Sequence, residues 1–507
     1  MSQTRFLIDT NIVIGLEDNK AIDPVYSTLS SLCYKHKASL YVHEASIRDI
    51  ERDRNLERKK IILTKLKKFS PIKTVLNPEI DTREALTEKF GKIPKENDLV
   101  DIELLLSLEV GVVDFLITED SGIHKRAERV GIEDRVFTAK DAIDWLKQTY
   151  ETHNVDLPRV EEKECYEISH YINNDPIFDS IRNDYEGFND WFQKKCIAEH
   201  RKCWVVQEDR KLAGIVIKKD NDNEKLSFDA NKVMKVCTFK VAEDYRGEKL
   251  GEQLLKQILW YAHKNNYNGI YLTAYPKKQE FLINFLERFG FFISGKVGEG
   301  QIILEKRLTP KGDEENLPPF EFHTKFYPKY RQDSSVSKFF IPIKPEYHER
   351  LFPEIKPKVK NNQLSLFPDG NEDSNGVPGN TIRKVYLCRA SSKQIKAGDI
   401  LIFYKSKNSF ITSIGIIESI HEPKDFKELI QMTAKRSVYS LTEQEKLMEE
   451  NSTPLRVINF YLVGHFTNFL DLKELKKSEI LKGAPQSISM TSNDKYNNIM
   501  KLTELRI

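Results

Sequence analysis

The amino-acid sequence predicts a multidomain α/β protein, with a parallel sheet near its N-terminus, a mixed α/β domain in its middle and a small β-barrel at its C-terminal end. Residues 1–148 alternate short apolar, β-branched segments with helical patterns, which is typical of parallel strands joined by helices. Residues 165–308 place several strands around one Leu-rich amphipathic helix, whereas residues 336–507 are rich in alternating strand patterns. A chain of 507 residues is long enough for more than one hydrophobic core.

Two of the N-terminal apolar segments end in a carboxylate. Asp9 ends the segment FLID, and Asp120 ends FLITED. Because the carboxyl ends of parallel strands meet at one edge of a sheet, both side chains are expected in one crevice. Between them in the sequence lie two further acidic clusters, which contain Asp49, Asp53, Asp98 and Asp101.

Carboxylates that share a crevice repel one another unless a cation neutralises them. Oxygen ligands without a Cys or His cluster favour Mg²⁺ or Mn²⁺ over Zn²⁺. Such an ion lowers the pKa of bound water and stabilises charge during in-line attack on phosphate. The acidic set therefore predicts a metal-dependent nuclease.

The order and spacing of these acids resemble the PIN domain, a nuclease fold found in toxin and RNA-processing ribonucleases, over about residues 4–148. The resemblance implies that the catalytic metal ligands are Asp9, Asp49, Asp101 and Asp120, with Asp98 as a further ligand and Asn11 and Thr118 as supporting residues. Glu44 and Asp53 stay open as alternatives to Asp49. Asp98 competes with Asp101 because residues three apart share a helix face.

The middle of the chain contains strands in CWVVQED, KLAGIVIKK and VMKVCTFKV, then the loop RGEKLG and a helix. The helix repeats apolar residues at the spacing of a buried face, with Leu250, Leu254, Leu255, Ile258 and Tyr261. At the start of that helix, backbone N–H groups and the positive end of the helix dipole could bind a pyrophosphate.

This order resembles the GNAT acyltransferase fold over about residues 165–308, which implies acetyl-CoA as a cofactor. By the resemblance, the pyrophosphate loop consists of Arg246, Gly247, Lys249, Leu250 and Gly251. Lys249 stands where the family usually has a glycine, and Leu286 stands where many members have the tyrosine that protonates the thiolate. Tyr271 or Tyr275 could replace that acid, and Glu243 could act as a general base.

The C-terminal segments GDILIFY and IGIIESI resemble PUA-like barrels of the ASCH and EVE branch, over about residues 336–507. Members of that superfamily commonly bind RNA or a modified base. The expected nucleic-acid contacts are Arg383, Tyr404, Lys405, Arg436 and Tyr439, with Lys384, Arg389, Lys435, Phe403 and Tyr461 as further candidates. Polar connectors are expected at 149–164 and 309–335, and a flexible insertion at 357–380.

Composition limits the alternatives. With 79 basic and 77 acidic residues, any surface for nucleic acid must be local, and one candidate is an amphipathic helix in the basic stretch 56–69. We expect Ile61, Ile62, Leu66 and Phe69 on its inner face, and Lys59, Lys60, Lys65, Lys67 and Lys68 on its outer face. The six cysteines form no CxxC pair, and no apolar stretch reaches the roughly 20 residues of a membrane span. A cytoplasmic protein without a membrane partner is expected.

The leading interpretation is a Mg²⁺- or Mn²⁺-dependent endonuclease of toxin or defence type. Its expected substrate is RNA ahead of DNA, its expected inhibitor is an antitoxin protein, and its oligomeric state stays open. An acyl-CoA-dependent N-acetyltransferase that acts on RNA or protein, with the PIN-like domain as a scaffold, is the alternative. A non-catalytic RNA-binding adaptor is the third interpretation.

Overall fold

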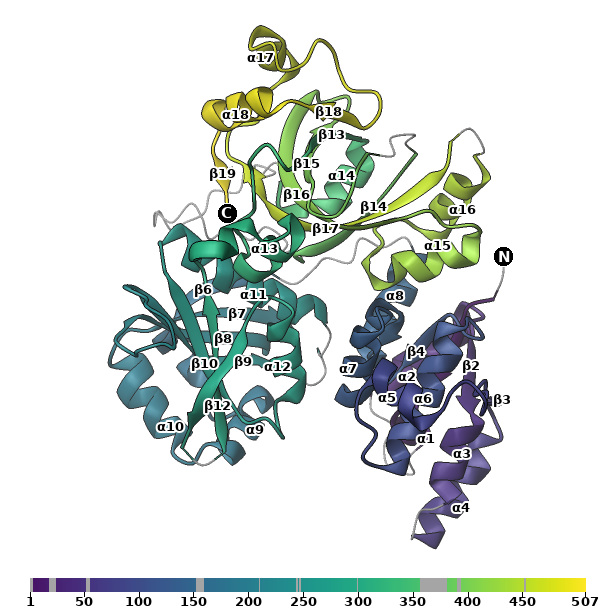
Figure 1. The fold of residues 1–507 in the computed structure, drawn as a ribbon. Coiled ribbons are helices and arrows are strands. Elements are labelled where there is room, and N and C mark those ends of the chain that lie inside the picture. Colours follow the sequence, from purple (N-terminus) through teal and green to yellow (C-terminus); the bar gives the residue numbers. More distant parts are fainter. Residues whose placement is uncertain are drawn as a thin grey trace. The chain divides into compact units, whose positions relative to one another are not determined.

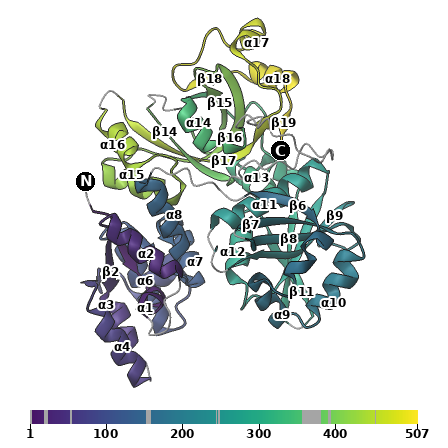
Figure 2. The same ribbon diagram turned by 180° about the vertical axis from the view of Figure 1, so that it is seen from behind.

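The computed structural model divides into two compact units, Met1–Val155 with Pro423–Asn451 and Asp156–Glu422 with Ser452–Ile507 (Figures 1 and 2). The residues that it describes are 3–17, 24–51, 55–151, 159–208, 210–242, 245, 248–298, 300–355, 381–389, 394–450 and 453–507. The predicted insertion at 357–380 lies outside them.

The first unit is built on a five-stranded sheet in the order β3-β2-β1-β4-β5, with every neighbouring pair parallel. The predicted parallel sheet is therefore present. Its strands are β1 (Arg5–Ile8), β2 (Ser39–His43), β3 (Ser70–Ile72), β4 (Phe115–Ile117) and β5 (Val136–Phe137). Apolar residues alternate between two faces, so that Phe6 joins one buried cluster and its neighbour Leu7 the other.

Helices cover both faces of this sheet, as expected where strands are buried on both sides. The helices are α1 (Thr10–Glu17), α2 (Pro24–Lys35), α3 (Glu44–Glu51), α4 (Leu56–Leu66), α5 (Arg83–Phe90), α6 (Glu96–Glu109), α7 (Ser121–Arg129) and α8 (Ala139–Tyr150), with the short turn η1 (Glu133–Arg135). Trp145 of α8 packs against Phe6 and Phe115, with ring centroids 5.8 and 4.8 Å apart.

A helical pair from the C-terminal third of the sequence completes the first unit. It consists of α15 (Phe426–Thr433), the turn η8 (Ala434–Arg436) and α16 (Leu441–Glu449). Ile430 and Ala434 are buried in the core that also contains Phe6. The domain predicted at 336–507 therefore does not pack as one body, because Pro423–Asn451 packs with the N-terminal region.

The second unit begins with a seven-stranded sheet in the order β11-β12-β10-β9-β8-β7-β6. Its strands are β6 (Val160–Glu164), β7 (Lys202–Glu208), β8 (Lys211–Asp222), β9 (Val233–Val241), β10 (Gly269–Ala274), β11 (Phe292–Val297) and β12 (Gln301–Arg307). Its helices include α9 (Asp179–Asp184), α10 (Phe188–Trp191), α11 (Glu248–Lys264) and α12 (Glu280–Glu287). The predicted inner face of α11 is confirmed for Leu250, Leu254, Leu255 and Ile258, which are all buried.

A second seven-stranded sheet follows, in the order β14-β17-β16-β15-β13-β18, with β19 paired to β17. Its strands are β13 (Lys338–Ile343), β14 (Arg383–Arg389), β15 (Ile400–Lys405), β16 (Phe410–His421), β17 (Leu455–Phe466), β18 (Ser489–Thr491) and β19 (Leu505–Arg506). The accompanying helices include α13 (Pro319–Phe326), α14 (Pro345–Leu351), α17 (Leu472–Lys477) and α18 (Asn493–Leu502). Within the described ranges no strand pairing joins β14 to β18, so a closed barrel stays a prediction.

The two sheets of the second unit meet through aromatic residues of the predicted connector 309–335. The hydroxyl of the fully buried Tyr327 donates a hydrogen bond of 2.8 Å to the carbonyl oxygen of Leu462 on β17. It accepts one of 2.9 Å from the indole N–H of Trp260 on α11. None of the helices in the described part of the chain is long and apolar enough to span a bilayer.

Candidate active sites

The parallel pairing of β1 with β4 brings Asp9 and Thr118 together, because each residue directly follows its strand. The Thr118 hydroxyl donates to Asp9 Oδ2 at 2.7 Å, and Asn11 Nδ2 donates to the same oxygen at 2.6 Å. Asp9 is only 8% exposed. These bonds fix the carboxylate at the carboxyl edge of the sheet.

Asp120 lies at the same edge and caps helix α7. Its Oδ1 accepts from the backbone N–H groups of Gly122 at 2.7 Å and Ile123 at 3.2 Å. A capping aspartate stabilises a helix by itself, so this geometry alone gives Asp120 a structural role.

Asp101 links these residues electrostatically. Its pKa is raised to about 7, chiefly by burial and then by the negative charges of Asp120 and Asp9, while the positive charge of Arg126 lowers it. The part of the rise that comes from Asp120 and Asp9 requires these carboxylates to lie within electrostatic reach of Asp101. Asp9, Asp101 and Asp120 therefore influence one another near the carboxyl edge of the sheet, and these three residues are called the acid cluster below.

Asp98 is occupied by other partners. Its Oδ2 accepts from the backbone N–H of Lys95 at 2.7 Å, and its Oδ1 pairs with Arg126 at 2.8 Å. Both oxygens therefore stabilise the start of α6 and its contact with α7, which argues against Asp98 as a metal ligand.

The second predicted ligand is placed only by its backbone. Asp49 lies on α3, but its side chain, like the whole of Asp53, lies outside the described residues. Among the side chains that are described, no three from His, Cys, Asp and Glu lie close enough together to hold a metal ion. The mutual repulsion around Asp101 fits a divalent cation chemically, although the described ligands do not form a finished metal site.

A buried polar cluster beside α6 was not singled out from the sequence. Arg48 pairs with Glu103 Oε1 at 2.5 Å, and His43 Nδ1 lies 4.0 Å from Glu103 Oε2. Burial lowers the pKa of His43 to about 4. Since no motif marks these residues, only the packing of α3 on α6 could have located them.

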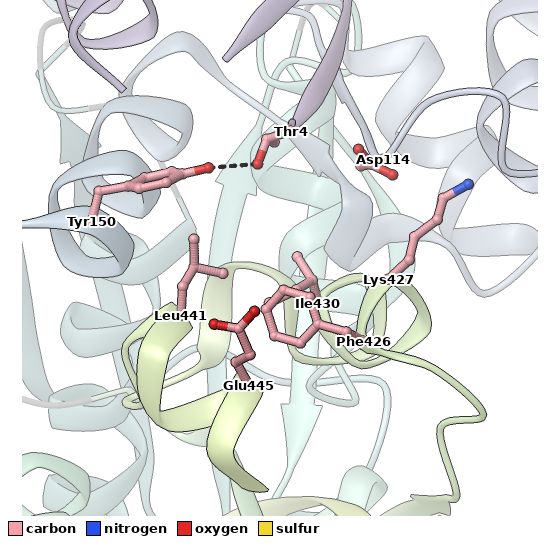
Figure 3. A pocket seen from close by; sticks show the side chains of 8 residues that line it. All are labelled: Thr4, Asp114, Tyr150, Phe426, Lys427, Ile430, Leu441 and Glu445. Atoms are coloured by element: carbon pink, nitrogen blue, oxygen red, sulfur yellow. Dashed lines mark hydrogen bonds between the residues drawn. The ribbon is translucent and has the colours of Figure 1, made fainter. Parts of the chain in front are cut away.

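A small pocket of about 40 Å³ lies at the opposite, amino edge of the sheet (Figure 3). It is lined by Thr4, Asp114, Tyr150, Phe426, Lys427, Ile430, Leu441 and Glu445. Thr4 Oγ1 and the Tyr150 hydroxyl lie 2.7 Å apart across it. A space of this size has room for a few water molecules and is too small for a substrate.

The second candidate site lies where the parallel pairing of β9 with β10 ends. They pair in parallel through three residues each, ending at Lys235 and Tyr271, although β9 continues to Val241 and β10 to Ala274. The register of β8 with β9 also shifts beside Cys237, a β-bulge that bends β9. The diverging strands leave a gap in the ladder next to the start of α11.

Three residues of the predicted pyrophosphate loop are described, all in the first turn of α11. Leu250 is buried in the core, and a Cβ atom on Gly251 would lie 3.9 Å from the ring of Phe285. Lys249 is partly exposed. Arg246, Gly247 and the predicted base Glu243 lie outside the described residues.

The two alternative acids have different surroundings. The Tyr271 hydroxyl donates to Asp222 Oδ2 at 2.6 Å, and burial raises its pKa above the ordinary range. Tyr275, just past β10, is partly exposed and packs 5.4 Å from the ring of Tyr185, which the sequence gave no reason to select. Leu286 is buried, so no acid occupies the usual position.

Four predicted nucleic-acid contacts, Arg383, Tyr404, Lys405 and Tyr439, are buried, and the side chain of Arg436 is only 6% exposed, which corrects the prediction for these side chains. Arg383 pairs with Glu418 at 2.9 Å, Lys405 with Glu349 at 3.1 Å, and Arg436 with Asp134 at 3.0 Å. Tyr404 and Tyr439 are each 1% exposed. Basic residues that look surface-exposed in sequence are here neutralised inside the protein, because burying them requires an acidic partner.

Comparisons with known proteins bear on the second site. No curated protein matches the chain. Similar solved structures include the PaiA N-acetyltransferase of Thermoplasma acidophilum in complex with coenzyme A, with 16% identity, a TM-score of 0.23, and coverage of 29% of this chain and 98% of that one. ASCH from Zymomonas mobilis has 13% identity, a TM-score of 0.24, and coverage of 33% and 96%.

The remaining comparison is with family models. The model described as "Acetyltransferase (GNAT) family" matches residues 161–291, which contain β6 to α12 and the gap between β9 and β10. The chain therefore contains a domain of the GNAT acetyltransferase family.

Proposed function

We propose that the protein is an acyl-CoA-dependent N-acetyltransferase that acts on RNA or on a protein. The family match of residues 161–291 carries this proposal, and the gap between β9 and β10 supports it. Acetyl-CoA, when bound, supplies the acetyl group as a thioester.

The residues around the gap suit such a ligand. Among the described residues, the backbone of β9 past Lys235 has no ladder partner on the β10 side, so its peptide groups can bond to the amides of an extended ligand. The first turn of α11 offers backbone N–H groups to a pyrophosphate, with Lys249 as an added positive charge. Tyr275 at the end of β10 is the best placed proton donor, because Tyr271 is bonded to Asp222.

Calorimetry with acetyl-CoA on the full chain tests binding, and transfer of labelled acetyl groups to cellular RNA and protein fractions tests the reaction. Micromolar binding and a labelled acceptor are expected. Absence of heat at millimolar acetyl-CoA contradicts the proposal.

We propose Mg²⁺- or Mn²⁺-dependent endonuclease activity as a second function. The repulsion of Asp101 by the carboxylates of Asp120 and Asp9 favours it. Asp9, Asp101 and Asp120, with Asp49 from α3, would hold the ion, which supplies an activated water molecule and charge stabilisation. RNA is the proposed substrate ahead of DNA, and a toxin or defence role with a protein inhibitor follows from the PIN resemblance.

The test incubates the full chain with labelled RNA and DNA in Mn²⁺ or EDTA. Cutting that requires Mn²⁺ and disappears in Asp9→Asn and Asp120→Asn is expected. Asp179→Asn, in the second unit, is the matched control. Cutting that persists in EDTA or in both Asp variants would falsify this mechanism.

A further inference from the structure

Helix α4 concentrates positive charge that the overall composition hides. Residues 56–73 contain seven basic residues and one acidic residue, a net charge of +6, whereas the whole chain carries only +2. A local excess of this kind attracts polyanions even when the protein is nearly neutral, because salt screens charges beyond about 8 Å.

The helix is anchored by one apolar edge. Ile62 and Leu66, four residues apart, are buried in the core shared with Ile12 of α1. The sequence predicted Ile61 on the inner face as well, but Ile61 is 38% exposed. Leu56, at the start of the helix, is 76% exposed. The outward face of α4 therefore carries both cations and apolar side chains.

The exposed cations lie on this face and in the turn that directly follows α4. Lys60, Lys67 and Lys68 are exposed, while Lys59 and Lys65 are partly exposed. The helix spans about 9 Å along its axis from Lys60 to its last residue, Leu66, and Lys67 and Lys68 follow in the turn beyond it. A row of this length can follow several phosphates of one strand.

Helix α4 lies at the same edge of the sheet as the acid cluster. Helix α3 starts directly after β2, and β2 runs parallel to β1, whose carboxyl end carries Asp9. Helix α4 packs against α3 and against α1, whose first residue follows Asp9. Figures 1 and 2 both show α3 and α4 extending from the unit beside α1.

We infer that the outward face of α4, with Lys60, Lys67 and Lys68, binds the phosphate backbone of single-stranded RNA and guides it to the acid cluster. The inference rests on the proposed nuclease function. Carboxylates repel phosphate until a metal binds, so a substrate needs cations next to them. Leu56 and Ile61 favour a single strand, because only unpaired bases expose their apolar faces.

The test measures binding of a fluorescein-labelled, mixed-sequence 25-nucleotide RNA to the full chain by anisotropy in EDTA, where no cutting occurs. Lys60→Gln/Lys67→Gln/Lys68→Gln should weaken binding by about tenfold or more at low salt and reduce the slope of log K against log salt by about two. The matched control is Lys473→Gln/Lys476→Gln/Lys477→Gln on α17, which removes the same charge from exposed positions of the second unit.

Each outcome decides the inference. Equal losses in both triple variants, no loss in the α4 variant, or no RNA binding by the unmodified chain would overturn it. Tighter binding of DNA or duplex RNA of the same sequence would overturn the assignment to single-stranded RNA. If the chain binds RNA through the outward face of α4 but does not cut it in Mn²⁺, the nuclease proposal is wrong, whereas the assignment of RNA binding to this face is supported. If the chain cuts RNA and the α4 variant keeps the same KM, the outward face of α4 does not bind the substrate, and the nuclease proposal is unaffected.

Discussion

The Thr118 hydroxyl donates a 2.7 Å hydrogen bond to Asp9 Oδ2, although 109 residues separate the two in the sequence. Both follow neighbouring parallel strands, so the bond exists because β1 and β4 pair in register from Phe6 with Phe115. It orients one carboxylate oxygen before any metal arrives. Preorganisation of this kind lowers the free energy needed to assemble a metal site.

Thr118→Val is the direct test of that orientation. Valine keeps the buried shape but leaves Asp9 with one donor fewer, which should lower the free energy of unfolding by about 1–3 kcal/mol. If the nuclease proposal holds, metal-dependent cutting should fall by about tenfold or more, as for other residues that orient metal ligands. Thermal unfolding and RNA cleavage measure the two effects. Unchanged cutting with reduced stability would leave Thr118 a structural residue.

Asp101 predicts a pH dependence of stability. Its pKa in the fold, about 7, exceeds the ordinary 3.8, so the fold binds the Asp101 proton more tightly than the unfolded chain does. The resulting stability is fully present below pH 4 and lost as the pH rises through 7, a change of about 4 kcal/mol. Asp101→Asn removes this loss. The variant should therefore unfold at a higher temperature than the unmodified chain at pH 8, with the difference vanishing near pH 4.

Bound Mn²⁺ should reduce the repulsion between Asp101 and the carboxylates of Asp9 and Asp120. At pH 8 it should raise the unfolding temperature of the unmodified chain, and raise that of Asp101→Asn less, because the variant has one charge fewer to neutralise. Differential scanning calorimetry with Ca²⁺ and with EDTA supplies the controls. Equal shifts in both proteins would show that the ion binds elsewhere.

Tyr275 and Tyr271 can be separated by kinetics. Tyr275→Phe should lower kcat for acetyl transfer by about 10² or more with little change in the KM for acetyl-CoA. Tyr271→Phe should chiefly reduce stability, since its hydroxyl is bonded to Asp222. The reverse pattern would assign the acid to Tyr271.

The buried pair of Lys256 on α11 with Glu354 predicts a large effect on stability. Lys256 and His465 both hydrogen-bond to the Glu354 carboxylate, and their charges hold its pKa well below the usual range. Glu354→Gln leaves the Lys256 ammonium buried without a countercharge, which should cost about 3–5 kcal/mol. The double variant Lys256→Met/Glu354→Leu should recover most of that loss. Chemical denaturation of the second unit checks both values.

Local sequence patterns predicted many of the strands and helix faces, whereas side-chain partners that are distant in the sequence could not be predicted. The apolar run before Asp9 and the spacing from Leu250 to Ile258 specify a strand and a helix face without reference to the rest of the chain. By contrast, Arg383 looks like a phosphate contact until Glu418 is placed beside it. Tyr185 carries no motif, and only its packing against Tyr275 marks it.

The position of 423–451 was missed for a related reason. A segment between two strands of one sheet is expected to stay with that sheet, since sequential elements are usually neighbours. Here the apolar face of α15 instead fits the N-terminal core, and Lys427 donates to the carbonyl oxygen of Gly111 at 2.7 Å. Complementarity of two surfaces distant in sequence leaves no signal in a single sequence.

That placement makes the last prediction. Ile430→Ala on α15 should destabilise the first unit by about 2–4 kcal/mol, because it opens a cavity in the core that contains Phe6 and Trp145. Hydrogen exchange should then speed up in α8 and β5 while β16 and β17 keep their protection. Ile417→Ala on β16, which also removes a buried side chain, is the matched control and should show the opposite pattern. Faster exchange in β16 and β17 after Ile430→Ala, with α8 unchanged, would show that α15 and α16 pack with the sheet of β16 and β17 and not with the first unit.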